Sequence, residues 1–361
     1  MVSDHARPAS GAGIVFDGLT KRYGATAALD NFSLEIHAGE FMTLLGPSGS
    51  GKTTALNALA GFVPPDSGRI LVGRQSILEL PPEQRQLGMV FQSYTLFPHM
   101  NVYDNVAFPL RLRKTPASET KRKVEEVLGM VQLSDLAGRM PRELSGGQQQ
   151  RVAFARAVVF EPPVLLMDEP LSALDLKLRQ AMQLEIRQYH AALGCTIIFV
   201  THDQEEALVL SDRVAVMNNG RICQVDTPDR IYDHPNSRYV AEFIGKTNIF
   251  QIETGTNGQA HIRETGSAVP TIAASSTDAR WLSVRPEKIS RTQGNTDDAV
   301  AFSGTVCEVL FLGNLIQYGV RTPGGTVVLV QEHRASNVAP PAMHDQIDLQ
   351  FRFSDALAVR D

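Results

Sequence analysis

The sequence predicts a protein of two domains: an α/β domain with a parallel sheet and a helical insert, and a smaller all-β domain after it. Up to about Thr247, short apolar segments alternate with longer helical ones, which is typical of a parallel sheet flanked by helices. Beyond that residue, short alternating segments are divided by Gly and Pro, which is typical of one or two small barrels. We therefore expect an N-terminal extension at residues 1–13, the α/β domain at 14–246 and the all-β domain at 247–361.

The strands of the parallel sheet are predicted where short segments are almost continuously apolar, as strands buried on both faces should be. These segments are Phe41–Leu45, Gly88–Phe91, Val164–Met167 and Thr196–Val200. Two further strands, Arg213–Met217 and Arg221–Val225, flank a stretch that contains Asn219-Gly220, and Asn-Gly is the strongest short signal for a hairpin.

Helical periodicity over Glu119–Val131 and again after Gly147 predicts a helical insert at about residues 93–160 of the α/β domain. In the tail, the alternating segments Thr305–Leu312 and Thr326–Gln331 predict strands of the all-β domain.

The composition is that of a globular protein, with 43% hydrophobic and 20% charged residues and a net charge of -5. No overall basic field therefore favours binding to nucleic acid or to an anionic membrane. The three cysteines are scattered, so neither a disulfide framework nor a zinc site is indicated, and a reducing compartment is expected. The N-terminal segment lacks the apolar core of a secretory signal, and no apolar run reaches the roughly 18 residues that cross a bilayer.

A glycine-rich loop follows the first buried strand and opens a helix, which predicts a phosphate-binding loop. It fits the pattern G-x-x-x-x-G-K-[ST], with residues Gly46, Pro47, Ser48, Gly49, Ser50, Gly51, Lys52 and Thr53, followed by Thr54. Its backbone N–H groups would surround phosphate, Lys52 would neutralise β- and γ-phosphate oxygens, and the Thr53 hydroxyl would bind Mg²⁺. A Gly-Ser linker is the alternative, but the strand and the helix around the loop favour a P-loop NTPase core that binds ATP and Mg²⁺.

Two acidic residues end the apolar segment that begins at Val164. Taken alone, they would indicate a strand that runs out into solvent. Beside a phosphate loop, they resemble the Walker B motif, in which Asp168 would hold Mg²⁺ and Glu169 would polarise the attacking water. Neighbouring residues of a strand point to opposite faces, but a turn at the strand end would let both carboxylates reach one site.

The segment Leu144–Gln148 has the sequence LSGGQ, and a helix is expected to follow it. Its Ser145 would serve as an ordinary helix N-cap in the simplest interpretation. With Gln149-Gln150-Arg151 after it and the Walker B residues beyond, however, the segment closely resembles the signature of ABC-type ATPases.

The other motifs of that family stand in the expected order. Tyr23 matches the aromatic residue that stacks on adenine, Gln92 matches the Q-loop, and His202 matches the switch histidine. The segment Ser172-Ala173-Leu174-Asp175 matches the D-loop, with Asp175 near the nucleotide. Each match is weak by itself, but together they cover residues 14 to about 245.

The resemblance implies a homodimer in which two chains pack head to tail around ATP. Lys52, Gln92, His202 and Mg²⁺ would then act from one chain, with Thr53, Gln92 and Asp168 as the magnesium residues and Glu169 as the general base. The other chain would contribute its signature residues, which are Ser145, Gly146, Gly147 and Gln148.

The resemblance is compatible with three kinds of ABC protein: an importer ATPase, an exporter ATPase, and a soluble ATPase of translation or repair. Ser283–Ile289 and Gly304–Tyr318 resemble the C-terminal OB-like (TOBE) barrel of importer ATPases for maltose, polyamines, ferric iron or sulfate, although a Pro turn between two strands would also explain the first segment. Ser93–Met100 resembles the patch that receives a permease. Neither zinc modules, a second ATPase cassette nor membrane spans are expected, which favours the importer.

The resemblance implies two permease subunits, an indirect link to a substrate-binding protein, no nucleic acid, and a peripheral position on the cytoplasmic side of the inner membrane. The stretch from Leu178 to Leu208 is most similar to the polyamine and phosphonate branches. We expect one of these cargoes, with ferric iron, sulfate or sugar as alternatives.

Overall fold

The computed structural model describes residues 11–92, 96–172, 174–254, 260–268, 281–291, 298–334 and 339–361. The chain forms two compact units, Met1–Pro228 and Asp229–Asp361. Among the described residues, no helix is long and apolar enough to span a membrane.

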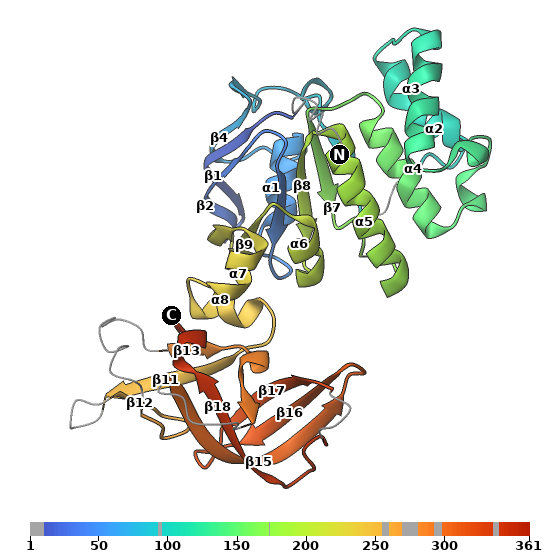
Figure 1. Ribbon diagram of the computed structural model, residues 1–361. Helices are drawn as coiled ribbons and strands as arrows, with labels where there is room; N and C mark the ends of the chain where they lie inside the picture. The colour runs from blue at the N-terminus through green and yellow to red at the C-terminus, as the bar shows by residue number, and fades with distance from the viewer. Residues whose placement is uncertain are drawn as a thin grey trace, which may run out of the picture. The chain divides into compact units, whose positions relative to one another are not determined.

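A six-stranded sheet organises the first unit (Figure 1). Its strands lie in the order β10-β9-β3-β8-β7-β6, and all neighbours except β10 and β9 run parallel. Their bounds are β3 (Phe41–Leu45), β6 (Gly88–Val90), β7 (Val164–Asp168), β8 (Thr196–Thr201), β9 (Arg213–Asn218) and β10 (Arg221–Asp226). The six predicted strands are thus confirmed to within one residue at each end.

The hairpin between β9 and β10 forms at the predicted Asn-Gly dipeptide. Asn219 and Gly220 both have positive φ, 48° and 76°, and Arg221 pairs with Asn218 across the turn. Two successive positive φ angles give the turn a twist that matches that of the flanking strands.

A second, antiparallel sheet in this unit was not predicted. It has the order β2-β1-β4-β5, from β1 (Ile14–Tyr23), β2 (Thr26–Ile36), β4 (Ser67–Val72) and β5 (Gln75–Ser76). The pairing of β1 with β2 and with β4 contains register shifts. Such shifts interrupt the alternation of apolar and polar residues by which strands are identified in a sequence.

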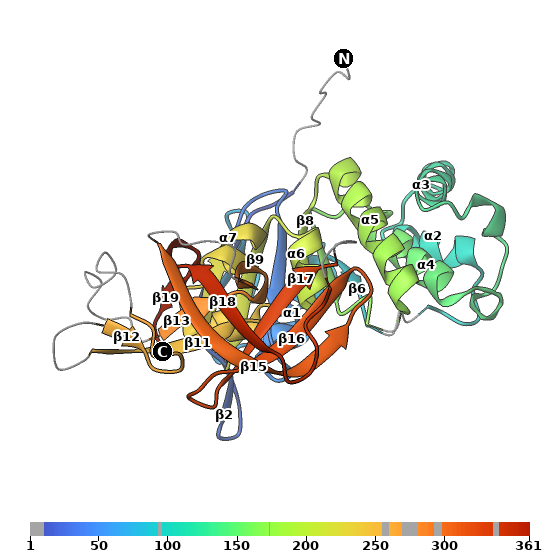
Figure 2. The same ribbon diagram turned by 60° about the horizontal axis from the view of Figure 1, so that its bottom comes forward.

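Six α-helices accompany the two sheets in the described part of the first unit. Their bounds are α1 (Lys52–Ala60), α2 (Val102–Leu112), α3 (Ala117–Met130), α4 (Gly146–Val158), α5 (Leu176–Leu193) and α6 (Gln204–Leu210). Figures 1 and 2 both show α2, α3 and α4 grouped together, apart from α1. This group is the helical part that the sequence predicts.

The parallel sheet separates two hydrophobic cores. In β8, Ile197 and Phe199 belong to the core formed with α2–α5, whereas Ile198 and Val200 belong to the core formed with α1 and the antiparallel sheet. Successive side chains of a strand point to opposite faces, so a strand between two cores must be apolar at every position. The sheet is thereby fixed from both sides, and its strand ends become rigid supports.

The second unit begins with two short helices and continues as antiparallel sheets. The helices are α7 (Pro228–Asp233) and α8 (Arg238–Phe243), and the two sheets have the orders β12-β11-β13-β19 and β14-β18-β15-β16-β17. The strands are β11 (Asn248–Thr254), β12 (Ala260–Ile262), β13 (Trp281–Val284), β14 (Ser290–Arg291), β15 (Ala299–Phe311), β16 (Leu315–Arg321), β17 (Val327–His333), β18 (Gln346–Arg352) and β19 (Leu357–Val359).

The two sheets of this unit enclose one core. Phe250 and Phe351 stack with ring centroids 5.8 Å apart, and Phe302 meets both rings edge-on. The all-β fold predicted for the tail is therefore confirmed.

Arg285 ties α7 and α8 to the β-strands of the second unit. Its side chain, which is buried, donates to the carbonyl oxygens of Tyr232 at 2.8 Å and of Ala241 at 3.1 Å, and also to that of Ile244. The two compact units consequently divide at Pro228, whereas the domain boundary at residues 246 and 247 stays a prediction.

Candidate functional site

The phosphate loop connects β3 to α1, and two of its glycines are required by close backbone approaches. A Cβ on Gly46 would lie 2.4 Å from the carbonyl oxygen of Met217, and one on Gly51 would lie 2.3 Å from that of Ala28. Gly51 also has a φ of 101°, in a region that side chains rarely tolerate. The surrounding backbone thus fixes the curl of the loop.

The Lys52 ammonium lies inside this loop. The side chain is only 4% exposed, and its Nζ donates to the carbonyl oxygens of Gly46 at 2.8 Å and Pro47 at 3.0 Å. Burial lowers the pKa of Lys52, and the nearby carboxylates of Glu169 and Asp168 oppose that shift. The loop thereby holds a cation where a phosphate would enter.

A hydroxyl and a carboxylate meet beside the loop. Thr53 Oγ1 donates to Asp168 Oδ1 over 3.1 Å, which joins the start of α1 to the end of β7. Burial raises the pKa of Asp168, opposed first by the hydrogen bond from Thr53. Mg²⁺ prefers oxygen ligands and usually takes only one or two from the protein, with phosphates and water completing its shell. The pair fits that requirement, and the described residues contain no cluster of three acidic, His or Cys side chains that could hold a metal alone.

Glu169 turns back toward Asp168 because its backbone adopts a left-handed conformation, with φ of 44°. Its N–H donates to the carbonyl oxygen of Val200 at 2.9 Å, which fixes the turn. The predicted turn at the end of this strand is therefore present.

Three residues that the sequence assigned to separate motifs converge at this turn. Glu169 Oε1 lies 3.2 Å from Nδ1 of His202, and Gln92 Nε2 donates to Glu169 Oε2 over 3.3 Å. The Gln92 amide also contacts the Ser172 hydroxyl at 3.4 Å. A carboxylate held between an amide and an imidazole has a fixed orientation, which suits it to accept a proton from water.

The signature residues are not part of this cluster within one chain. Ser145 is the N-cap of α4: its Oγ accepts from the N–H of Gln148 at 3.4 Å, and the Gln148 side chain accepts from the N–H of Ser145 at 2.9 Å. Figures 1 and 2 draw α4 beside α2 and α3 rather than beside α1. The N-cap interpretation thus describes the isolated chain, and Gly146 and Gly147 form the first turn of the helix.

Two other predicted residues lie at the ends of secondary-structure elements. Tyr23 ends β1 and is 54% exposed, so its ring is accessible for stacking. Asp175 is the N-cap of α5 and accepts from the N–H of Leu178 at 3.0 Å. The D-loop residue Ala173 lies outside the described residues.

A group of charged residues that the sequence did not indicate lies next to His202. It consists of Arg179 on α5, Asp203, which caps α6, and the buried Glu206. Asp203 followed by Glu206 is a recognisable helix-start pattern and could have been found in the sequence. No local pattern marks Arg179, because its acidic partners Asp203 and Glu206 are distant in the sequence.

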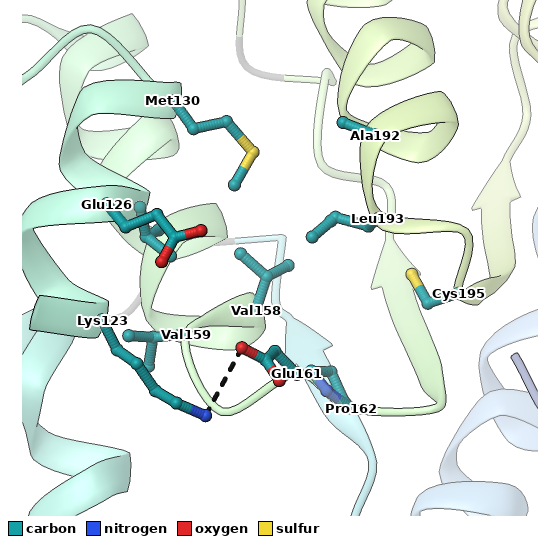
Figure 3. A pocket seen from close by; sticks show the side chains of 11 residues that line it. Lys123, Glu126, Met130, Val158, Val159, Glu161, Pro162, Ala192, Leu193 and Cys195 are labelled. Atoms are coloured by element: carbon teal, nitrogen blue, oxygen red, sulfur yellow. Dashed lines mark ion pairs between the residues drawn. The ribbon is translucent and has the colours of Figure 1, made fainter. Parts of the chain in front are cut away.

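A cavity of about 190 Å³ lies elsewhere in the first unit, between α3, α4 and α5 (Figure 3). Its wall is mostly apolar, and Lys123 and Glu161 form an ion pair of 3.4 Å at its edge. Burial raises the pKa of the Cys195 thiol in this wall to about 11, so the thiol is not a nucleophile at neutral pH. The cavity contains none of the predicted nucleotide residues.

A phosphate loop between a buried parallel strand and a helix, with two carboxylates at the end of β7, which β8 separates from β3 in the sheet, defines a P-loop nucleotide-binding protein. Residues 29–172 match the ABC transporter family, and residues 282–359 match the TOBE domain. The chain is 49% identical over 315 residues to the spermidine/putrescine import ATP-binding protein PotA of Pseudomonas aeruginosa strain UCBPP-PA14, covering 85% of this chain and 87% of that protein. It is 46% identical over 342 residues to the protein of the same name from Thermobifida fusca strain YX, covering 91% and 87%.

Two solved structures share the fold of the first unit. One is the ATP-binding cassette MJ0796, a dimer in a post-hydrolysis state with ADP and Pi, at 32% identity and a TM-score of 0.54 over 60% of this chain and 98% of that chain. The other is CbiO1 of Clostridium perfringens, part of an ABC transporter complex, at 32% identity and a TM-score of 0.57 over 60% and 89%.

The chain belongs to the ABC transporter family. It is an ATPase of that family with a C-terminal TOBE domain, as the sequence predicts.

Proposed function

We propose that this chain is the ATP-hydrolysing subunit of an ABC importer for polyamines. The observation that carries the proposal is the 49% identity to a spermidine/putrescine import ATP-binding protein, which extends over 85% of this chain and therefore beyond the cassette. It favours a polyamine over phosphonate, ferric iron, sulfate or sugar. It also favours the importer over an exporter or a soluble ATPase of translation or repair.

In this proposal, the residues around the phosphate loop bind and orient the nucleotide. The Lys52 ammonium exchanges its two carbonyl partners for phosphate oxygens, and the exposed Tyr23 ring stacks on adenine. The residues that would hold Mg²⁺ are Thr53, Asp168 and Gln92, and the ion would neutralise phosphate charge there. Glu169 accepts the proton of the attacking water, with Gln92 and His202 fixing its carboxylate.

A second copy of the chain completes the site in the proposal. The signature residues Ser145 to Gln148 start a helix, and helix N-termini bind anions through their free N–H groups and positive potential. Within one chain they lie apart from the phosphate loop, so a head-to-tail partner would place them on the phosphates. The dimeric state of the similar cassette MJ0796 supports this arrangement.

The permease would dock beside Gln92, on the cytoplasmic face of the membrane. Two exposed aromatic side chains, Phe62 at 51% and Phe91 at 36%, lie there with ring centroids 6.1 Å apart. In the predicted patch at residues 93–100, Phe97 is half-buried against Phe108, with centroids 4.6 Å apart, while Tyr94 lies outside the described residues.

The test is reconstitution of the chain in liposomes with the permease and binding protein that co-purify with it. We expect ATP hydrolysis to rise when spermidine or putrescine is supplied and to be lost in Lys52→Ala, because no other side chain of the loop carries a positive charge. Lys123→Ala, which removes a lysine distant from the loop, is the control. Hydrolysis by a folded Lys52→Ala protein would overturn the site, and stimulation by a phosphonate instead of a polyamine would overturn the cargo.

A further inference from the structure

His202 occupies a short link between two elements. β8 ends at Thr201, and α6 begins at Gln204 after its N-cap Asp203. The imidazole is 55% exposed, and its Nδ1 lies 3.2 Å from Oε1 of Glu169. So little packing surrounds the ring that its position depends on the residues that hold the link.

Asp203 is held through both of its carboxylate oxygens. Oδ1 accepts from the N–H groups of Glu205 at 2.8 Å and Glu206 at 3.2 Å, which caps α6. Oδ2 accepts from Nη1 of Arg179 at 2.9 Å. The N–H of Asp203 also donates to Thr201 Oγ1 at 3.0 Å, so a hydrogen bond joins the two residues on either side of His202.

Arg179 connects this link to the segment that follows Glu169. Its Nη2 donates to the carbonyl oxygen of Leu174 at 3.2 Å, and its Nε lies 3.7 Å from the carboxylate of the buried Glu206. Arg179 therefore contacts both Leu174, which follows Glu169 in the chain, and Asp203, which follows His202. The contact between His202 and Glu169 closes this circuit.

We propose that Arg179 is a positioning residue that holds His202 against Glu169. It rests on the proposed roles of Glu169 and His202 in ATP hydrolysis. The guanidinium suits this task because its planar fork binds Asp203 with one nitrogen and Leu174 with the other. The single ammonium of a lysine cannot bridge both in the same geometry.

The first test is a double-mutant cycle of ATP hydrolysis in the full-length chain. Arg179→Gln should lower kcat about tenfold or more, up to the roughly 10²–10⁴-fold that a positioned acid or base contributes, and leave the affinity for fluorescent ATP unchanged. In a His202→Gln background, Arg179→Gln should cause no further loss, because residues that act through one another are not additive. Arg179→Lys, which keeps the charge beside Glu206, should fold like wild type and not restore kcat.

The matched control is Arg187→Gln. Arg187 lies on the same helix and also donates to a backbone carbonyl, that of Val209, at 2.6 Å. The Arg187→Gln protein should hydrolyse ATP at the wild-type rate. An equal loss from Arg179→Gln with and without His202, or a full kcat in Arg179→Gln, would overturn the inference.

The second test does not depend on activity. In NMR spectra of protein isotopically labelled at histidine, the ring signal of His202 is identified by its absence in His202→Gln. We expect its chemical shift to change in Arg179→Gln and in Glu169→Gln, and to stay the same in Arg187→Gln. An unmoved His202 signal in Arg179→Gln would contradict the inference even if all rates were low. If wild-type protein failed to hydrolyse ATP, or Lys52→Ala retained hydrolysis, the proposed function would fail instead.

Discussion

The Thr53 hydroxyl and the Asp168 carboxylate, 115 positions apart in the sequence, lie 3.1 Å from each other. The first belongs to the helix after the phosphate loop and the second to the end of β7. This contact joins the two halves of the predicted magnesium site within one chain.

Replacement of Asp168 should raise the stability of the protein while it removes the activity. Burial raises the pKa of this carboxyl above its ordinary value of 3.8, so the folded chain holds a proton there more tightly than the unfolded chain. The favourable contribution of the Asp168 carboxyl to the free energy of unfolding is therefore fully present below about pH 3.8. It is lost as pH rises through the raised pKa, because the buried carboxyl then ionises. We expect Asp168→Asn to melt at a higher temperature than wild type at pH 7 while losing Mg-dependent hydrolysis. A lower melting temperature would show that the hydrogen bond from Thr53 outweighs the burial.

The head-to-tail arrangement predicts a dimer that depends on ATP. Glu169→Gln keeps the shape of the proposed base but cannot accept the proton, so it should trap ATP between two chains. Sedimentation velocity should show a dimer of Glu169→Gln that gains stability with Mg-ATP, and adding Ser145→Arg should remove this effect by blocking the signature. Ser134→Arg, at an exposed serine of the same helical part, is the control. Closure of the Ser145→Arg double mutant with ATP would contradict the arrangement.

Arg285 should be essential for the stability of the second unit. Its buried guanidinium satisfies carbonyl oxygens of Tyr232, Ala241 and Ile244, and an unsatisfied buried polar group costs roughly 1–3 kcal/mol. Arg285→Ala should therefore reduce the free energy of unfolding by roughly 3 kcal/mol or more. Arg263→Ala removes an arginine that is 62% exposed and should change it little. Chemical denaturation of the full chain measures both.

The aromatic pair beside Gln92 should contribute to binding of the permease and not to binding of the nucleotide. Phe62→Asp places a charge on a side chain that is 51% exposed, so folding and ATP affinity should be preserved. Co-purification with the permease in detergent should be lost. Leu184→Asp, at an apolar residue of α5 that is 62% exposed, should still co-purify. Equal binding by both variants would place the docking surface elsewhere.

The sequence predicted those parts of the structure that are encoded locally. The buried strands, the phosphate loop and the Asn219-Gly220 turn each depend on a short run of residues with a specific chemistry. The sheet of β1, β2 and β4 was missed because its register shifts break the alternation of side chains.

The motifs indicated which residues belong to the site but not how they meet. The contacts of Glu169 with Gln92 and His202 follow from the order of strands in the sheet, which no single segment specifies. Arg179 was missed for the same reason, since Asp203 lies 24 positions further along the chain.

The left-handed backbone of Glu169 carries a cost that is independent of its chemistry. A residue with a Cβ pays roughly 1–2 kcal/mol in that conformation, whereas glycine pays almost nothing. Directed evolution that selected this protein only for heat resistance would thus reward Glu169→Gly. The enriched variants would lack the proposed base, so a laboratory screen for heat resistance has to measure phosphate release in every round.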